Sequence, residues 1–142
     1  MARLKLQITG KELATFRIPV RITDINYGNH LGNNAMVEII HEARMQFLQL
    51  HDFTELQAGG TALIMSELSV EFKQESFYQD ILMISVYCGE ISRVGFELFY
   101  KISVTRDGKT ILIANAKTGM VCFNYEQRVT ESVPEGLKAI LK

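Results

Sequence analysis

The stretch RITDINYGNHLGNNAMVEIIHEAR, residues 21–44, decides the fold of this chain. Residues 24–32 are rich in Asn, Gly and Asp, which are typical of a loop. Asn33 or Asn34 can cap a helix that the apolar pattern extends to about Leu50. A helix start is an electropositive pole with free backbone N–H groups. The polar side chains crowded around this pole therefore indicate a site for negative charge that develops on an oxygen atom.

The predicted helix has one apolar face, with apolar residues three or four positions apart, the spacing of a stripe that packs on a core. The stripe comprises Met36, Ile39, Ile40, Ala43, Phe47 and Leu50. Glu38, Glu42, Gln46 and Gln49 fall on the opposite side. So broad an apolar face must be buried against another layer.

The remaining sequence predicts antiparallel strands. They cover residues 14–22, 66–73, 81–88, 94–104 and 111–123. The third is apolar on both faces, which favours a central position in the sheet. Pro19 favours an edge position or a bulge for the first, and Asp107–Gly108 is a strong hairpin signal. A short helix over residues 135–142 completes an α+β fold, whose open sheet edges invite pairing between subunits.

Composition and charge narrow the functional classes. The 142 residues are enough for one domain with one core, and the formal net charge of −1 favours neither nucleic acid nor an anionic membrane as a partner. No apolar run approaches the roughly 18 residues of a membrane span, and residues 1–10 lack the apolar stretch of a signal peptide. We expect a soluble, cytoplasmic protein with one domain over residues 1–142.

No metal site is predicted, because such a site needs clustered ligands. Cys88 and Cys122 lie far apart on predicted strands, and His30, His41 and His51 form no cluster with either of them. Buried free thiols are the expected state of the two cysteines.

The order of elements and two motifs resemble the hotdog-fold thioesterases, and most closely the group of 4-hydroxybenzoyl-CoA and short-chain acyl-CoA thioesterases. That group carries a pattern like Asp-x-Asp-x-x-Gly-His-Val-Asn-Asn before a helix that ends Glu-Glu-Ala-Arg. The matching positions here are Asp24, Asn26, His30, Leu31, Asn33, Glu38, Glu42, Ala43 and Arg44. The stretch FKQESFYQDI, residues 72–81, is similar to the group's Tyr-x-x-Pro-x-x-Tyr-Gly-Asp. The resemblance implies one long central helix wrapped by a five-stranded antiparallel sheet.

The resemblance also implies an activity and its partners. The expected reaction is hydrolysis of an acyl-CoA or acyl-carrier-protein thioester to a carboxylate and a free thiol. No cofactor is implied beyond the CoA or phosphopantetheine of the substrate, which would run between the subunits of a homodimer or homotetramer. By family position, Lys73 and Arg93, with Lys117, are candidates to bind its phosphates.

One departure from the family pattern bears on mechanism. The second acid of the first motif, a nucleophile or general base in many members, falls on Asn26, and an amide cannot take a proton at neutral pH. Asn26 could instead position water or substrate, or it could be a turn residue. Backbone N–H groups at Gly32, Asn33 and Asn34 are the natural donors to an oxyanion.

Three ionisable residues are candidates to activate water, each with a structural alternative. Asp24 could act as a base or cap a turn. His30 could act as a base, since histidine titrates near neutral pH, or it could be a loop residue bonded to backbone carbonyls. Glu42, with Glu38 one turn away, could reach a substrate at a subunit interface, or it could face solvent or pair with Arg44.

Three functions remain open on this sequence. The first is a thioester hydrolase. The second is a non-hydrolytic acyl-thioester-binding protein of the same fold, in which the change to Asn26 has removed hydrolysis. A hydratase or dehydratase of the fold is a distant third, because the Asp/His pair that such enzymes commonly use has no match here.

Overall fold

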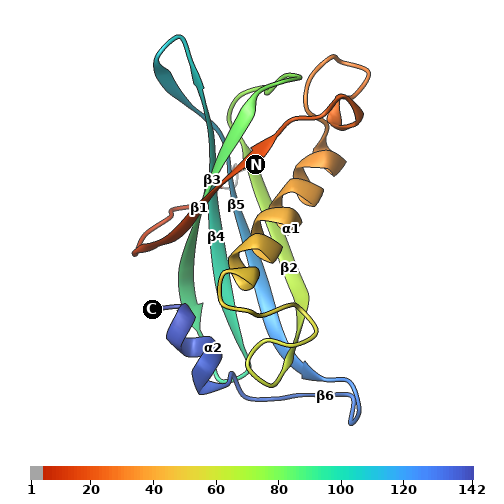
Figure 1. Cartoon of the computed structure of the whole chain (residues 1–142), viewed down its shortest axis with the longest axis vertical. Coiled ribbons are helices and arrows are strands. Elements are labelled where there is room, and N and C mark those ends of the chain that lie inside the picture. The colour runs from red at the N-terminus through yellow and green to blue at the C-terminus, as the bar shows by residue number, and fades with distance from the viewer. Residues whose placement is uncertain (1–4) are drawn as a thin grey trace.

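The computed structural model describes residues 5–142, in which one long helix, α1, packs against an antiparallel sheet (Figure 1). The elements are β1 (Glu12–Pro19), a 3-10 turn η1 (Ile22–Asp24), α1 (Asn33–Gln49), β2 (Ala62–Phe72), β3 (Ile81–Ile91), β4 (Gly95–Arg106), β5 (Lys109–Asn124), β6 (Val129–Thr130) and α2 (Glu135–Ile140). Residues 1–4, part of the stretch in which no signal peptide is expected, lie outside the described residues.

The strands follow the order β1-β3-β4-β5-β2, and all pairs are antiparallel. The predicted α+β hotdog architecture is confirmed, with the two-residue strand β6 added beside β5. β3 lies inside the sheet between β1 and β4, as its two apolar faces predict. Asp107 and Gly108 join β4 to β5 with φ of 51° and 74°, the positive values that a two-residue hairpin turn requires.

The core lies between α1 and the concave face of the sheet. Phe16, Ile84, Ile102 and Ala114 are in register across β1, β3, β4 and β5, and all four are buried. The helix stripe that packs on this face comprises Ala35, Met36, Ile39, Ile40, Ala43, Phe47 and Leu48. This arrangement fixes the start of α1 at one end of the sheet.

Three sequence predictions for residues at the ends of elements are wrong. The first strand ends at Pro19, which cannot donate to a sheet, and Ile22 begins the 3-10 turn with 63% of its surface exposed. α1 ends at Gln49, within one residue of the predicted end, but Leu50 is 62% exposed and Leu48 is buried in its place, so the assignment of Leu50 to the apolar stripe is wrong. The N-cap of α1 is Gly32, with no capping side chain, rather than an asparagine.

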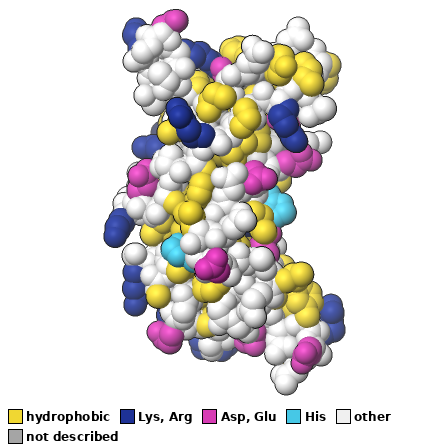
Figure 2. Space-filling view, viewed as in Figure 1, with side chains coloured by type: hydrophobic (Ala, Val, Ile, Leu, Met, Phe, Trp, Pro, Cys, Tyr) yellow, Lys and Arg dark blue, Asp and Glu magenta, His cyan; other side chains and the backbone are white. Residues whose placement is uncertain are grey.

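The face of the molecule seen in Figure 2 carries scattered charges. Lys, Arg, Asp and Glu side chains are dispersed over it, and hydrophobic side chains are visible between them (Figure 2). Within residues 5–142, no helix has both the length and the apolar character needed to cross a membrane.

Candidate active site

The loop that leads into α1 is held by hydrogen bonds. The Asn26 N–H donates to the His30 carbonyl over 2.9 Å, and the Asn26 side-chain oxygen accepts the Gly28 N–H over 2.9 Å. A Cβ at Gly28 would lie 3.1 Å from Nε2 of His30 and 3.3 Å from Oδ1 of Asn26, so the glycine leaves room for both side chains. Asn26 therefore has the turn role that was one of its two predicted alternatives.

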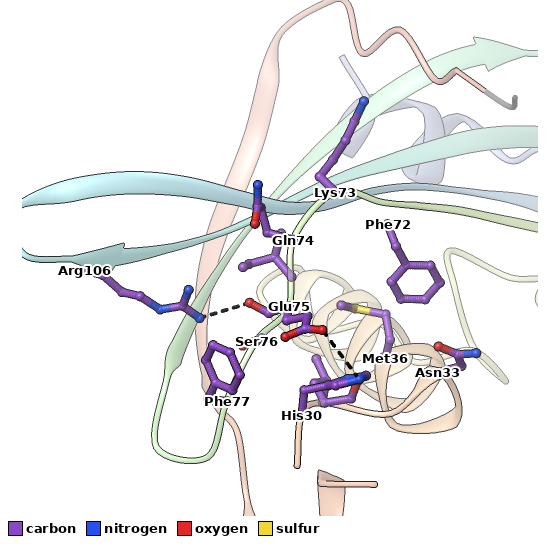
Figure 3. A pocket seen from close by; sticks show the side chains of 12 residues that line it. His30, Asn33, Met36, Phe72, Lys73, Gln74, Glu75, Ser76, Phe77 and Arg106 are labelled. Carbon is purple, nitrogen blue, oxygen red and sulfur yellow. Dashed lines mark hydrogen bonds and ion pairs between the residues drawn. The ribbon is translucent and has the colours of Figure 1, made fainter. Parts of the chain in front are cut away.

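A cavity of about 590 Å³ opens beside the start of α1 (Figure 3). Its walls are the loop before the helix, the first turn of α1, the β2–β3 connection and the ends of β4 and β5. The lining side chains include His30, Asn33, Met36, Phe72, Glu75, Phe77 and Arg106. Because Phe72 and Phe77 are 50% and 42% exposed, the cavity has apolar walls open to a ligand.

His30 presents one ring nitrogen to this cavity. Its Nδ1 lies 3.2 Å from the Leu31 carbonyl oxygen, and because a carbonyl only accepts, Nδ1 is the donor. Nε2 faces Glu75, with 3.9 Å between Nε2 and Oε1 (Figure 3). In the neutral ring, Nε2 then has a free lone pair and can accept a proton.

The helix start contributes backbone donors beside His30. Met36 makes the first bond of the helix, to the Gly32 carbonyl, and within residues 5–142 the N–H groups of Asn33 and Asn34 have no acceptor. The Gly32 N–H is engaged, because it donates to the Asp24 carbonyl over 3.0 Å. The prediction of Gly32 as an oxyanion donor is therefore wrong, while Asn33 and Asn34 keep the free donors expected of a helix start.

Two of the predicted catalytic residues, Asp24 and Glu42, line a second cavity of about 420 Å³ rather than the cavity of His30. The second cavity lies between β1 and the polar face of α1 and is lined by Asp24, Glu38 and Glu42, among others. Glu42 is exposed and accepts a hydrogen bond from Gln46 Nε2 over 2.9 Å. This geometry fits its solvent-facing alternative.

Asp24 is neutralised by Arg21. Its carboxylate accepts the Arg21 backbone N–H over 2.8 Å, Nε over 3.2 Å and Nη2 over 2.9 Å. Burial by itself would raise the pKa of Asp24, but these hydrogen bonds and the charge of Arg21 outweigh burial and lower the pKa. The arrangement fits the turn-capping alternative, since a carboxylate with a lowered pKa is a poor base.

We expect Asp24→Asn to lower the free energy of unfolding at pH 7 by about 1–2 kcal/mol, through loss of charge-assisted bonds to Arg21. Because the pKa of Asp24 is lower in the folded state than in the unfolded chain, its carboxylate stabilises the fold at pH values above the ordinary carboxyl pKa. This stabilisation is lost as the pH falls through the pKa of Asp24 in the folded state. The difference between wild type and variant should therefore narrow below about pH 4. Urea unfolding at pH 7 and pH 3 measures it, and equal stabilities at pH 7 would refute the role.

Two of the three predicted phosphate-binding residues, Lys73 and Arg93, lie apart. Lys73 lines the cavity, but its side chain points away from His30 and its Nζ lies 3.1 Å from Glu71 (Figure 3). The Arg93 carbonyl accepts the Val133 N–H over 2.9 Å, beside α2. Arg93 thus lies at the opposite end of the sheet, about 30 Å away by the rise of β5 between Ile113, which bonds to Lys73, and Cys122, which bonds to Val94. The two side chains cannot bind one phosphate group within a single chain.

Arg106, which sequence reasoning missed, holds the β2–β3 connection at the cavity. Its Nη2 donates to the Glu75 carbonyl over 3.1 Å and to the Asp80 carboxylate, and its guanidinium lies 4.9 Å from the Phe77 ring centroid. Asp80 also accepts the Ser76 hydroxyl and the Phe77 N–H, each over 2.8 Å. No local pattern marks Arg106, because it meets Asp80 only through the β3–β4 pairing.

Glu75 was missed as well. One signal could have found it: this acid stands where the motif matched by residues 72–80 has proline. Within residues 5–142, no group of three or more His, Cys, Asp and Glu side chains is arranged to hold a metal ion.

The family model described as the thioesterase-like superfamily matches residues 20–141. No curated protein matches the sequence. The fold is similar to that of a 1,4-dihydroxy-2-naphthoyl-CoA thioesterase from Synechocystis, with TM-score 0.79 and 22% identity over 89% of this chain and 93% of that one. It is also similar to an Asp-to-Asn mutant of 4-hydroxybenzoyl CoA thioesterase complexed with 4-hydroxybenzoyl CoA, with TM-score 0.80 and 16% identity over 91% and 98% of the two chains. A gentisyl-coenzyme A thioesterase gives TM-score 0.77 and 18% identity over 91% and 100%.

At these identities, the three structures support likeness of fold. The family match spans most of the sequence, including the loop before α1 and the whole of that helix. The chain therefore belongs to the thioesterase-like superfamily.

Proposed function

We propose that this protein hydrolyses acyl-CoA thioesters in the cavity at the start of α1. One observation carries the proposal: an imidazole nitrogen able to accept a proton, Nε2 of His30, and the open helix start at Asn33 border the same cavity. Thioester hydrolysis needs these two functions together, a base for water and donors for an oxyanion.

The reaction would proceed as follows. Nε2 of His30 takes a proton from water as the water oxygen bonds to the thioester carbon, and N–H groups of Asn33 and Asn34 stabilise the negative oxygen of the tetrahedral intermediate. The carbon–sulfur bond then breaks, and the thiolate takes the proton from the His30 imidazolium to become a free thiol. Because thiols have pKa values near 8.5, the leaving group needs little further help from an acid.

The lining and volume of the cavity favour an aromatic or short acyl group. Met36, Phe72, Phe77 and Ile113 offer apolar contact to an acyl group, and a volume of about 590 Å³ falls within the range of small-ligand sites. The three relatives are named for aromatic CoA esters: dihydroxynaphthoyl, hydroxybenzoyl and gentisyl. We therefore favour aromatic acyl-CoA substrates, with an acyl-carrier protein as the other candidate carrier.

A homodimer would complete the surroundings of this cavity. Among the described residues, β2 ends the sheet and pairs on one side only, with β5. An edge strand of this length is a template for pairing with another chain. We propose that a second copy pairs there, which would bring the partner's surface close to Phe72 and Lys73 at the end of β2.

A non-hydrolytic acyl-thioester-binding protein is the second candidate. Asn26 at the usual acid position and the neutralised Asp24 favour it. The Asp-to-Asn mutant relative is complexed with its acyl-CoA, so a protein of this fold can bind a thioester after losing one acid.

Release of free thiol from a panel of aromatic and straight-chain acyl-CoA esters tests the proposal, with acyl-carrier-protein thioesters as a second panel. We expect catalytic turnover with at least one aromatic ester. Binding of these esters, measured by calorimetry, without turnover on either panel would favour the second candidate.

A further inference from the structure

We propose that Glu75 supplies the carboxylate of this active site and that it acts through His30. The inference rests on the proposed hydrolysis. Glu75 would replace the acid that the family motif places at position 26, from a different segment of the chain. It is thus a positioning residue, and His30 remains the base.

The geometry places the two side chains face to face. Oε1 of Glu75 lies 3.9 Å from Nε2 of His30, within the cavity that both residues line (Figure 3). The Nδ1 bond to the Leu31 carbonyl fixes the opposite side of the ring, so Nε2 is the nitrogen left for the carboxylate and for water. The Glu75 backbone is held as well, because its carbonyl accepts the Arg106 Nη2–H.

The other acids near the helix start are engaged elsewhere. Both carboxylate oxygens of Asp24 accept hydrogen bonds from Arg21. Glu42 lines the second cavity and accepts a hydrogen bond from Gln46. Glu75 is the acid that lines the His30 cavity, whose other charged lining side chains are those of Lys73 and Arg106. Lys73 pairs with Glu71, and Arg106 pairs with Asp80, so neither cation neutralises the Glu75 carboxylate.

Glu75 would act at one stage of hydrolysis. When Nε2 of His30 takes the proton of the attacking water, the ring becomes positive, and a carboxylate 3.9 Å away stabilises that charge. The proton then leaves with the thiolate as the carbon–sulfur bond breaks, and the ring returns to its neutral form. Glu75 itself gains and loses no proton.

The test is the Glu75→Gln variant, assayed with the best substrate of the acyl-CoA panel. We expect kcat to fall about tenfold with KM within about twofold, because the carboxylate acts after substrate binds. The double variant Glu75→Gln with Gln74→Glu restores the net charge of the loop one residue away. Gln74 also lines the cavity, so this double variant distinguishes the effect of the carboxylate's position from the effect of net charge. Its kcat should be as low as that of Glu75→Gln.

A third variant tests replacement of the missing acid. Asn26 Oδ1 and His30 Nε2 both lie within 3.3 Å of the same point, the Cβ position of Gly28. Asn26→Asp would therefore bring a carboxylate near the ring, and we expect it to recover part of the activity of Glu75→Gln.

The division of the effect between kcat and KM reads the role of Glu75 directly, because a residue that only shapes the cavity would change KM as well. An unchanged kcat for Glu75→Gln in an active background would overturn the role of Glu75 and leave the proposed function standing. A wild-type protein without turnover on either panel would contradict the proposed function itself, and the role of Glu75 with it.

Discussion

Replacing His30 with alanine is expected to lower kcat/KM for acyl-CoA hydrolysis about 100- to 1,000-fold, the usual contribution of a general base. The variant removes the ring nitrogen that faces the cavity and leaves the apolar walls and helix donors in place. Acyl-CoA should therefore still bind, and the loss should be mostly in kcat. Stopped-flow or steady-state thiol release measures the rates, and calorimetry measures binding.

His51→Ala is the matched control for this prediction. His51 is exposed after the end of α1, where its ring meets Phe47 edge-on at 5.5 Å between centroids. We expect activity within twofold of wild type. A His30→Ala variant with activity within threefold of wild type would show that another group activates the water.

Arg44→Ala is expected to lower the free energy of unfolding by about 2–4 kcal/mol, somewhat less than the cost of breaking a fully buried ion pair, because Arg44 is buried and its partner Glu55 is half-buried. Arg44 is 5% exposed, and its Nε donates to Glu55 over 3.1 Å. Its Nη1 donates to the Tyr100 hydroxyl over 3.4 Å, and that hydroxyl shares a 2.8 Å hydrogen bond with Thr118. Arg44 thus links α1 to the following loop and to β4 and β5, and alanine would remove one partner each from the half-buried Glu55 carboxylate and the buried Tyr100 hydroxyl.

Urea unfolding of the variant measures this effect. Arg93→Ala removes an exposed arginine at the β3–β4 turn and should change the free energy of unfolding by less than about 0.5 kcal/mol. Arg44→Met keeps much of the side-chain volume without the charge. Its loss in the free energy of unfolding should lie between those of Arg93→Ala and Arg44→Ala. A loss under 1 kcal/mol for Arg44→Ala would mean that the network contributes little to stability.

Local patterns predicted the elements of the fold well. Apolar residues at helical spacing predicted α1, and the Asp107–Gly108 turn predicted the β4–β5 hairpin, because both signals depend on residues close in sequence. Element ends were less predictable. Ile22 and Leu50 continue the apolar pattern, but Pro19 and the last turn of α1 end their elements first.

The candidate site could be predicted only in part. The loop before α1 was found from its composition, and His30 and Asn33 do line one cavity. Asp24 lines a different cavity because its side chain points to the other side of the helix start. Residue spacing in an irregular loop does not reveal the direction of a side chain. Glu75 reaches His30 from 45 positions along the chain, where the Leu31 N–H donates to the Ser76 carbonyl over 2.8 Å, and this long-range placement lay beyond the sequence patterns.

The central claim is that the thioester carbonyl lies between His30 and the start of α1. A crystal structure with a ketone analogue of an aromatic acyl-CoA, in which a methylene group separates sulfur from the carbonyl, tests it most directly. We predict the carbonyl oxygen within hydrogen-bond distance of the Asn33 or Asn34 N–H, the aromatic group against Phe72, and Nε2 of His30 facing the carbonyl carbon. An analogue bound with its carbonyl in the second cavity, beside Asp24 and Glu42, would contradict the account.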